Sequence, residues 1–163
     1  MEYKIKNATK NDLDFVLSLN QQSLNAVSHS NFTQMNYFLD ISSYFKILHL
    51  NDSPIGFLIG IEPNKKYKSE NYRWINEKYQ SFIYVDRIII DSNYTNMGLG
   101  THFYNHLKNT FVGQYKYITC EVNVKPLNKY SLNFHKRYGF SISGEKETEG
   151  GKKRVVYLVY EIN

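Results

Sequence analysis

The stretch from Phe82 to Phe111 constrains the fold most, because it combines a hydrophobic run, two glycines and an amphipathic pattern. Residues 82–90 are rich in β-branched and aromatic side chains, which is typical of a strand buried on both faces. Gly98 and Gly100 follow a polar turn, and apolar residues then recur every fourth position, as on one face of a helix: Leu99, Phe103, Leu107 and Phe111. The stretch therefore predicts a strand, a glycine turn and a helix.

This unit is a candidate site for a phosphate group. A helix N-terminus leaves backbone N–H groups unpaired, and glycines ahead of it allow a phosphate to approach the backbone closely. The Lys-Ser or Lys-Thr pair of a Walker loop and the third glycine of the dinucleotide fingerprint are both missing. A plain strand-to-helix turn fits equally well, so both interpretations stay open at this point.

Two motifs in the chain resemble those of the GNAT superfamily of acyl-CoA-dependent N-acetyltransferases. The family pattern Arg/Gln-x-x-Gly-x-Gly/Ala is matched here by Thr95-Asn96-Met97-Gly98-Leu99-Gly100, with Thr95 where Arg or Gln is usual. The family's second CoA-site helix is matched by Asn128-x-x-Ser131-x-x-Phe134-His135-x-x-x-Gly139-Phe140. The resemblance runs from Tyr3 to Ile162. Three shorter blocks, at 71–74, 84–87 and 120–123, resemble a bacterial subgroup of predicted acetyltransferases.

The resemblance implies the fold and the binding site. We expect one α/β domain over residues 1–163, with a central, mixed but mostly antiparallel sheet of about seven strands flanked by helices, in the order β-α-α-β-β-(α)-β-α-β-α-β-β. The implied co-substrate is acetyl-CoA, with its pyrophosphate on backbone N–H groups and its pantetheine arm along the main strand. The implied binding residues are Ile88, Ile89, Ile90, Asn96, Met97, Gly98, Leu99, Gly100, Thr101, Asn128 and Phe134.

Hydrophobic periodicity and capping residues place the remaining elements. We expect strands at Tyr3–Lys6, Tyr44–Leu50, Ile55–Ile61, Tyr117–Val124, Phe140–Ser143 and Arg154–Ile162. We expect helices that begin near Thr9, at Thr33, at Ser69 and at Asn128; the first carries Leu13, Val16, Leu17 and Leu24. In the family the first two helices wall the acceptor site. The polar insertion from Pro63 to Gln80 is interpreted as a surface helix packed on the sheet or as a lid over the acceptor.

Acetyl transfer to an amine also needs a base, because an alkylammonium ion is protonated at neutral pH. Glu121 is the first candidate: it lies mid-strand in an apolar stretch, where burial raises the pKa of a carboxylate. It also matches a Glu that has this role in some ribosomal-protein acetyltransferases of the superfamily. Asp86 is the alternative base, and a salt bridge with Arg87 or Arg137 is its structural interpretation.

The leaving thiolate needs a proton. In many family members a Tyr seven residues after the motif's Asn supplies it, and His135 stands at that position here. Imidazole, with a reference pKa of about 6.5, is suited to this role. A packing role for His135, with Tyr130 or Tyr138 as the donor, stays open.

Other candidate chemistry is weaker. His102 and His106 have a spacing that can bind metal, but no third ligand is readable, so we expect no metal. Cys120 alternates onto the apolar face of its strand and is expected in the core. Without a nucleophile on the enzyme, the acceptor is expected to attack acetyl-CoA directly in a ternary complex.

Composition bounds the remaining alternatives. The formal charge is +5 and 16% of residues are aromatic, but the lysines are scattered, so we expect no specific nucleic-acid partner. No apolar run reaches membrane-spanning length, and there is one cysteine, so we expect a cytoplasmic protein, monomeric or homodimeric. The expected function is N-acetyl transfer to a primary amine on a small molecule or a polypeptide N-terminus. The alternative is a non-catalytic acyl-CoA-binding regulatory domain.

Overall fold

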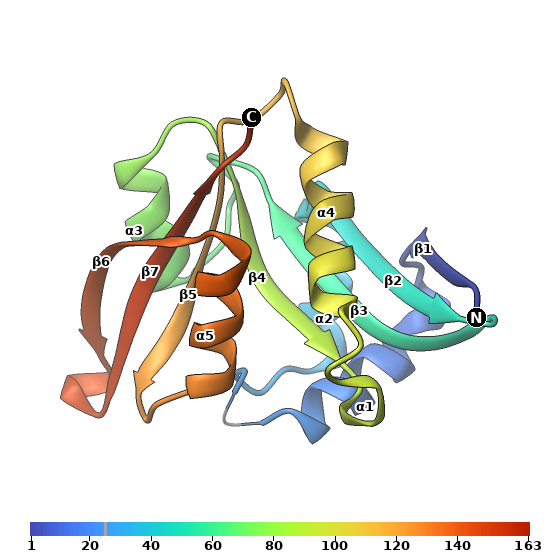
Figure 1. Cartoon of the computed structure of the whole chain (residues 1–163). Coiled ribbons are helices and arrows are strands. Elements are labelled where there is room, and N and C mark those ends of the chain that lie inside the picture. The colour runs from blue at the N-terminus through green and yellow to red at the C-terminus, as the bar shows by residue number, and fades with distance from the viewer. Residues whose placement is uncertain (25) are drawn as a thin grey trace.

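The computed structural model describes residues 1–24 and 26–163, which form one sheet with helices on both faces (Figure 1). The strands are β1 (Tyr3–Asn7), β2 (Tyr44–Leu50), β3 (Ser53–Ile61), β4 (Phe82–Ile90), β5 (Tyr117–Lys125), β6 (Ser141–Thr148) and β7 (Lys153–Glu161). The α-helices are α1 (Leu13–Gln22), α2 (Phe32–Ile41), α3 (Glu70–Lys78), α4 (Leu99–Phe111) and α5 (Lys129–Tyr138). The predicted element order is confirmed, including the helix in the insertion. None of the described helices is long and apolar enough to cross a membrane.

The sheet has the order β1-β2-β3-β4-β5-β7-β6, and β4 and β5 form its one parallel pair. These two strands pair only at their beginnings, where residues 82–84 of β4 pair with residues 117–119 of β5. Beyond that point they spread apart towards their carboxyl ends, as Figure 1 shows. The sheet is therefore split at its centre. This opening positions the candidate site.

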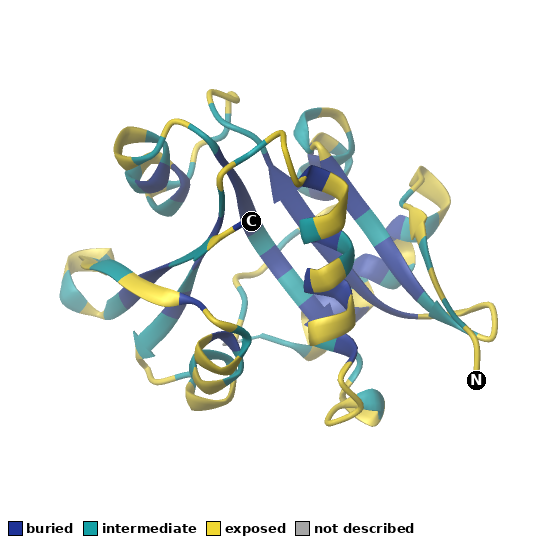
Figure 2. Cartoon of the chain, turned by 45° about the horizontal axis from the view of Figure 1, so that its top comes forward, coloured by how far each residue is buried: buried dark blue, intermediate teal, exposed yellow. Residues whose placement is uncertain are grey.

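Each face of the sheet has its own hydrophobic core. On one face, α4 packs against the sheet with a stripe that includes Leu99, Phe103 and Leu107, as its four-residue periodicity predicts. On the other face, the apolar sides of α1, α2 and α3 cover the sheet. Figure 2 shows the central strands as mostly buried between these layers. Because both faces are covered, the middle strands are hydrophobic nearly throughout.

Local sequence chemistry explains several element boundaries. The Ser69 side chain caps α3 by accepting a hydrogen bond from the Tyr72 backbone N–H, and Asn128 caps α5 through the Ser131 N–H. Asn51 and Asp52 have φ angles of 47° and 68°. A two-residue hairpin turn needs positive φ at both positions, and Asn and Asp tolerate it better than most residues. The predicted hairpin between β2 and β3 is confirmed with this short turn.

Three predicted boundaries were wrong. Asn31, not Thr33, caps α2, because its Oδ1 accepts the Gln34 N–H at 2.9 Å. Leu24 lies beyond the end of α1 at Gln22. β6 runs to Thr148, well past the expected end at residue 143, because β7 offers backbone partners along this whole length. Because its residues are polar and exposed, a search for hydrophobic runs does not detect this edge strand.

Candidate active site

A cavity of about 560 Å³ lies where β4 and β5 separate. It is lined by the second half of β4, the start of α4, β5 and α5, and also by residues from the α1–α2 connection and the start of α3. It brings together Asp86, Ile88, Ile89, Ile90, Asn96, Gly98, Leu99, Gly100, Thr101, Glu121, Asn128, Phe134 and His135. Of the predicted site residues, Met97 alone is not part of its lining, and this side chain is exposed on the turn.

The turn before α4 presents backbone N–H groups to this cavity. Gly98 has φ 73° and Asn96 has φ 61°, so the turn uses left-handed backbone that glycine and asparagine tolerate. The α4 helix begins at Leu99, and its first backbone hydrogen bond runs from the His102 N–H to the Gly98 carbonyl. The N–H groups just before His102 have no acceptor within the helix. This N-terminus therefore fits an anionic group, such as the pyrophosphate of CoA.

Gly100 serves helix packing. A Cβ atom on Gly100 would lie 2.7 Å from the Phe134 ring, closer than real contacts allow. The missing side chain lets Phe134 of α5 pack directly against the first turn of α4. The glycine pair thus has two separate uses, backbone conformation at Gly98 and close helix approach at Gly100.

Glu121 faces the α3 side of the sheet and lies in a polar cluster. The Tyr84 hydroxyl is 2.8 Å from each carboxylate oxygen, and the Asn71 amide nitrogen is 3.1 Å from Oε1. Burial and the nearby charge of Asp86 raise the pKa of Glu121 to about 8, although these two hydrogen bonds act against the shift. A carboxyl group with such a pKa can exchange protons near neutral pH.

Asp86 is engaged in a buried ion pair. Its Oδ2 lies 3.0 Å from the Arg87 Nε, and its Oδ1 accepts a hydrogen bond from the Tyr67 hydroxyl. The Arg87 guanidinium also binds the Ser28 carbonyl, which ties the α1–α2 connection to β4. The salt bridge expected as the alternative interpretation of Asp86 is therefore present, with Arg87 as the partner.

His135 is buried, with 3% of its surface exposed. Its Nδ1 lies 2.7 Å from the Ser131 carbonyl oxygen, which can only accept, so Nδ1 carries the proton. Its Nε2 lies 2.7 Å from the Tyr104 hydroxyl and accepts a hydrogen bond from it. Burial lowers the pKa of His135 to about 4. At neutral pH the ring is therefore in its neutral form, because burial disfavours the charged ring, and the proton-donor role expected for His135 has no imidazolium to supply it.

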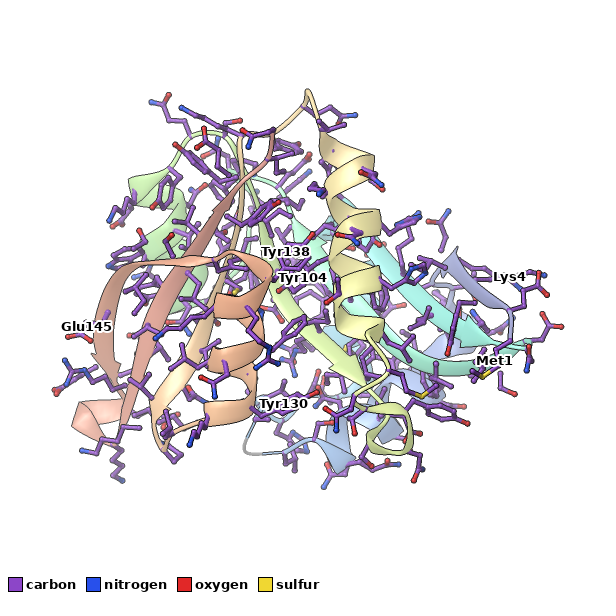
Figure 3. All side chains as sticks on the ribbon, viewed as in Figure 1. Met1, Lys4, Tyr104, Tyr130, Tyr138 and Glu145 are labelled. Carbon is purple, nitrogen blue, oxygen red and sulfur yellow. The ribbon has the colours of Figure 1, made fainter. Side chains whose placement is uncertain are left out.

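Tyr104 is a residue that sequence reasoning missed. Figure 3 shows it between α4 and α5, and it lines the cavity together with His135. Burial raises the pKa of Tyr104 well above its ordinary value, so its hydroxyl stays protonated. Its position on the buried stripe of α4 predicts packing, and nothing in the spacing indicates a contact with α5.

Tyr84, Asn71 and Tyr157 around Glu121 were also missed. Strand alternation places Tyr84 and Asp86 on the same face of β4, which is a usable signal. The β5–β7 register pairs Glu121 with Tyr157, and no local pattern gives that pairing. Among residues 1–24 and 26–163, no group of three His, Cys, Asp or Glu side chains is arranged to hold a metal ion.

The comparisons with known proteins identify the family and the fold. Residues 14–140 match the acetyltransferase (GNAT) family model, and the chain belongs to this family of acyltransferases. No curated protein matches the sequence.

Several solved structures share the fold at low sequence identity. Ard1 from Thermoplasma volcanium has a TM-score of 0.80 at 16% identity, covering 100% of this chain and 99% of that one. The ribosomal-protein-S18-alanine N-acetyltransferase from Escherichia coli has a TM-score of 0.75 at 14% identity, covering 99% and 95%. Arabidopsis thaliana Naa50 in complex with the bisubstrate analogue CoA-Ac-MVNAL has a TM-score of 0.73 at 16% identity, covering 98% and 99%.

Proposed function

We propose that this protein transfers an acetyl group from acetyl-CoA to a primary amine, on a small molecule or at a polypeptide N-terminus. One observation carries the proposal. The buried carboxyl group of Glu121, whose pKa burial raises to about 8, lines the same cavity as the start of α4, where unpaired backbone N–H groups fit an anion. The bisubstrate analogue bound by Naa50 joins CoA to a peptide, which supports a ternary complex by analogy.

The donor is assigned to the side of the cavity formed by α4, α5 and β4. In this assignment the N–H groups at the start of α4 would bind the pyrophosphate, and the edge of β4 from Ile88 to Ile90, which lines the cavity where β5 separates, would bind the pantetheine arm. Asn128 and Phe134 line the same side. The acceptor is assigned to the opposite side, formed by the α1–α2 connection and the start of α3.

In the proposed reaction, Glu121 accepts a proton from the amine. The nitrogen lone pair then attacks the thioester carbonyl, a C–N bond forms, and the C–S bond breaks with its electron pair on sulfur. The nitrogen of the new amide gives up its second proton, and the thiolate takes one proton and leaves as CoA, so that each turnover releases the one proton that Glu121 accepted. We assign this proton to the Tyr104 hydroxyl, which turns from its hydrogen bond with His135 Nε2 towards the sulfur as it donates and then regains a proton from solvent. Asp86 is assigned an electrostatic role, because Arg87 and Tyr67 already engage its two oxygens.

The test is release of free CoA from acetyl-CoA in the presence of a panel of amines and short peptides. Amine-dependent release that Glu121→Gln lowers supports the proposal. Tight CoA binding with no release for any acceptor would instead identify a non-catalytic acyl-CoA-binding domain.

A further inference from the structure

The carboxylate of Glu121 is held asymmetrically. The Tyr84 hydroxyl lies 2.8 Å from both oxygens, but it has one proton to share between them. The Asn71 amide nitrogen lies 3.1 Å from Oε1, and among the described residues no side chain besides Tyr84 donates to Oε2, while the carboxylate also accepts a hydrogen bond from its own backbone N–H. Oε1 is therefore the better stabilised oxygen, and Oε2 is the one left to accept a proton.

The orientation of the Asn71 amide is itself fixed. In its ionised form, the form that can take a proton from the amine, the Glu121 carboxylate only accepts hydrogen bonds, so the amide nitrogen of Asn71 faces it. The amide oxygen then faces the Tyr157 hydroxyl, which donates to it at 2.8 Å. Asn71 lies in the first turn of α3, two residues after the Ser69 cap and beside the buried Tyr72. The helix, its cap and β7 together hold the amide in place.

We propose that Asn71 is a positioning residue for Glu121, which holds Oε1 with its amide N–H so that Oε2 receives the proton of the acceptor amine. This inference rests on the proposed function. The insertion between β3 and β4 then has a defined use, because it brings a hydrogen-bond donor to the base from outside the sheet. The proton moves from the amine nitrogen to Oε2, which frees the nitrogen lone pair to attack the thioester.

The charged and titratable surroundings of Glu121 set the direction of the expected effect. Asp86 and Tyr84 of β4, Tyr157 of β7 and Tyr67 before α3 lie close enough for their charges to interact with Glu121, with Arg87 paired to Asp86; Cys120 of β5 and Tyr104 of α4 interact with it from the other side of the sheet, and Glu70 of α3 acts on Tyr157. The Asn71 hydrogen bond favours the ionised form of Glu121. Its loss must raise the pKa of this carboxyl group.

The test is a titration of the Glu121 carboxyl carbon by NMR in protein labelled with 13C-glutamate, with the resonance assigned by its absence in Glu121→Gln. Asn71→Leu should raise the midpoint by roughly one pH unit, which corresponds to one hydrogen bond to a charged group. The acid limb of kcat should move in the same direction. Asn76→Leu is the matched control, because Asn76 lies on the same helix and bonds to Asn64 away from the cavity.

Asn71→Asp keeps the shape of the side chain and replaces the donor by a second carboxylate, so it should raise the midpoint even if Asn71→Leu does not fold. A folded Asn71 variant with an unchanged Glu121 midpoint would overturn the inference. Because the titration needs no turnover, the two proposals fail separately. A raised midpoint in a protein that transfers no acetyl group would contradict the proposed function and leave the role of Asn71 intact. Acetyl transfer with an unchanged midpoint would contradict the role of Asn71 and leave the proposed function intact.

Discussion

Trp74 of α3 stacks on Tyr157 of β7, with ring centroids 4.0 Å apart and planes 10° apart. Trp74 also fills the space left by Gly144 of β6, where a Cβ would lie 2.6 Å from the indole ring. These contacts fasten the insertion helix to the β5–β7–β6 edge of the sheet. Of the two interpretations of the insertion, the helix packed on the sheet is the one observed, and its first turn also lines the cavity.

The Gly98 turn is tested by adding a charge where a phosphate is expected. Gly98→Asp should abolish CoA binding, because it places a carboxylate and a side chain beside the α4 N-terminus. Gly113→Asp is the matched control: both glycines are exposed and have positive φ (73° and 83°), and a Cβ added to either would meet no atom within 4 Å. Calorimetry with CoA should show loss of affinity in Gly98→Asp only. Equal affinities of both variants for CoA would exclude this turn as the phosphate-binding site.

The Tyr104–His135 pair is tested through turnover. Tyr104→Phe keeps the ring but removes the hydroxyl, so kcat should fall by about 10-fold or more while KM for acetyl-CoA changes little. His135→Phe removes the acceptor that orients Tyr104 and should lower kcat less. Both are compared with Tyr138→Phe, whose hydroxyl bonds to Asn105 on the outer side of the helices. If Tyr104→Phe keeps the wild-type kcat, Tyr104 is not the proton donor and water takes that role.

His135 also predicts how stability depends on pH. Its pKa is lowered by burial to about 4 in the folded protein, compared with an ordinary value near 6.5. As the pH falls below 6.5, the unfolded chain takes up a proton that the folded chain accepts only near pH 4, so stability declines in this window. Denaturant unfolding between pH 7 and pH 4.5 should show a smaller decline for His135→Gln, which cannot titrate. An identical decline in both proteins would contradict the buried neutral imidazole.

Much of the fold could be predicted from the sequence because its signals are local. The buried stripe of α4, the Ser69 and Asn128 caps and the Asn51-Asp52 turn depend on neighbouring residues alone. The extent of β6 could not be predicted in this way. Its pairing with β7 supplies backbone hydrogen bonds that a polar sequence does not reveal.

The candidate site was predictable where one residue carries the chemistry, as with Glu121. Its partners were not, because they come from distant segments: Asn71 is 50 positions away and Tyr84 is 37. The charge state of His135 could not be predicted from the sequence either, because it depends on the burial of the ring between α4 and α5. Strand and helix patterns indicate which residues face inward, but not which of them meet.

The role of Glu121 as the base is tested most directly by the pH dependence of kcat in Glu121→Gln, compared with Asp86→Asn and with wild type. A base must be deprotonated to act, so wild-type kcat should rise with pH around a midpoint near 8, the pKa of Glu121. Glu121→Gln should keep CoA affinity, lose this rise and lower kcat by roughly 100-fold, while Asp86→Asn should cost less. A Glu121→Gln enzyme with wild-type kcat and the same midpoint would contradict the assignment of Glu121 as the base.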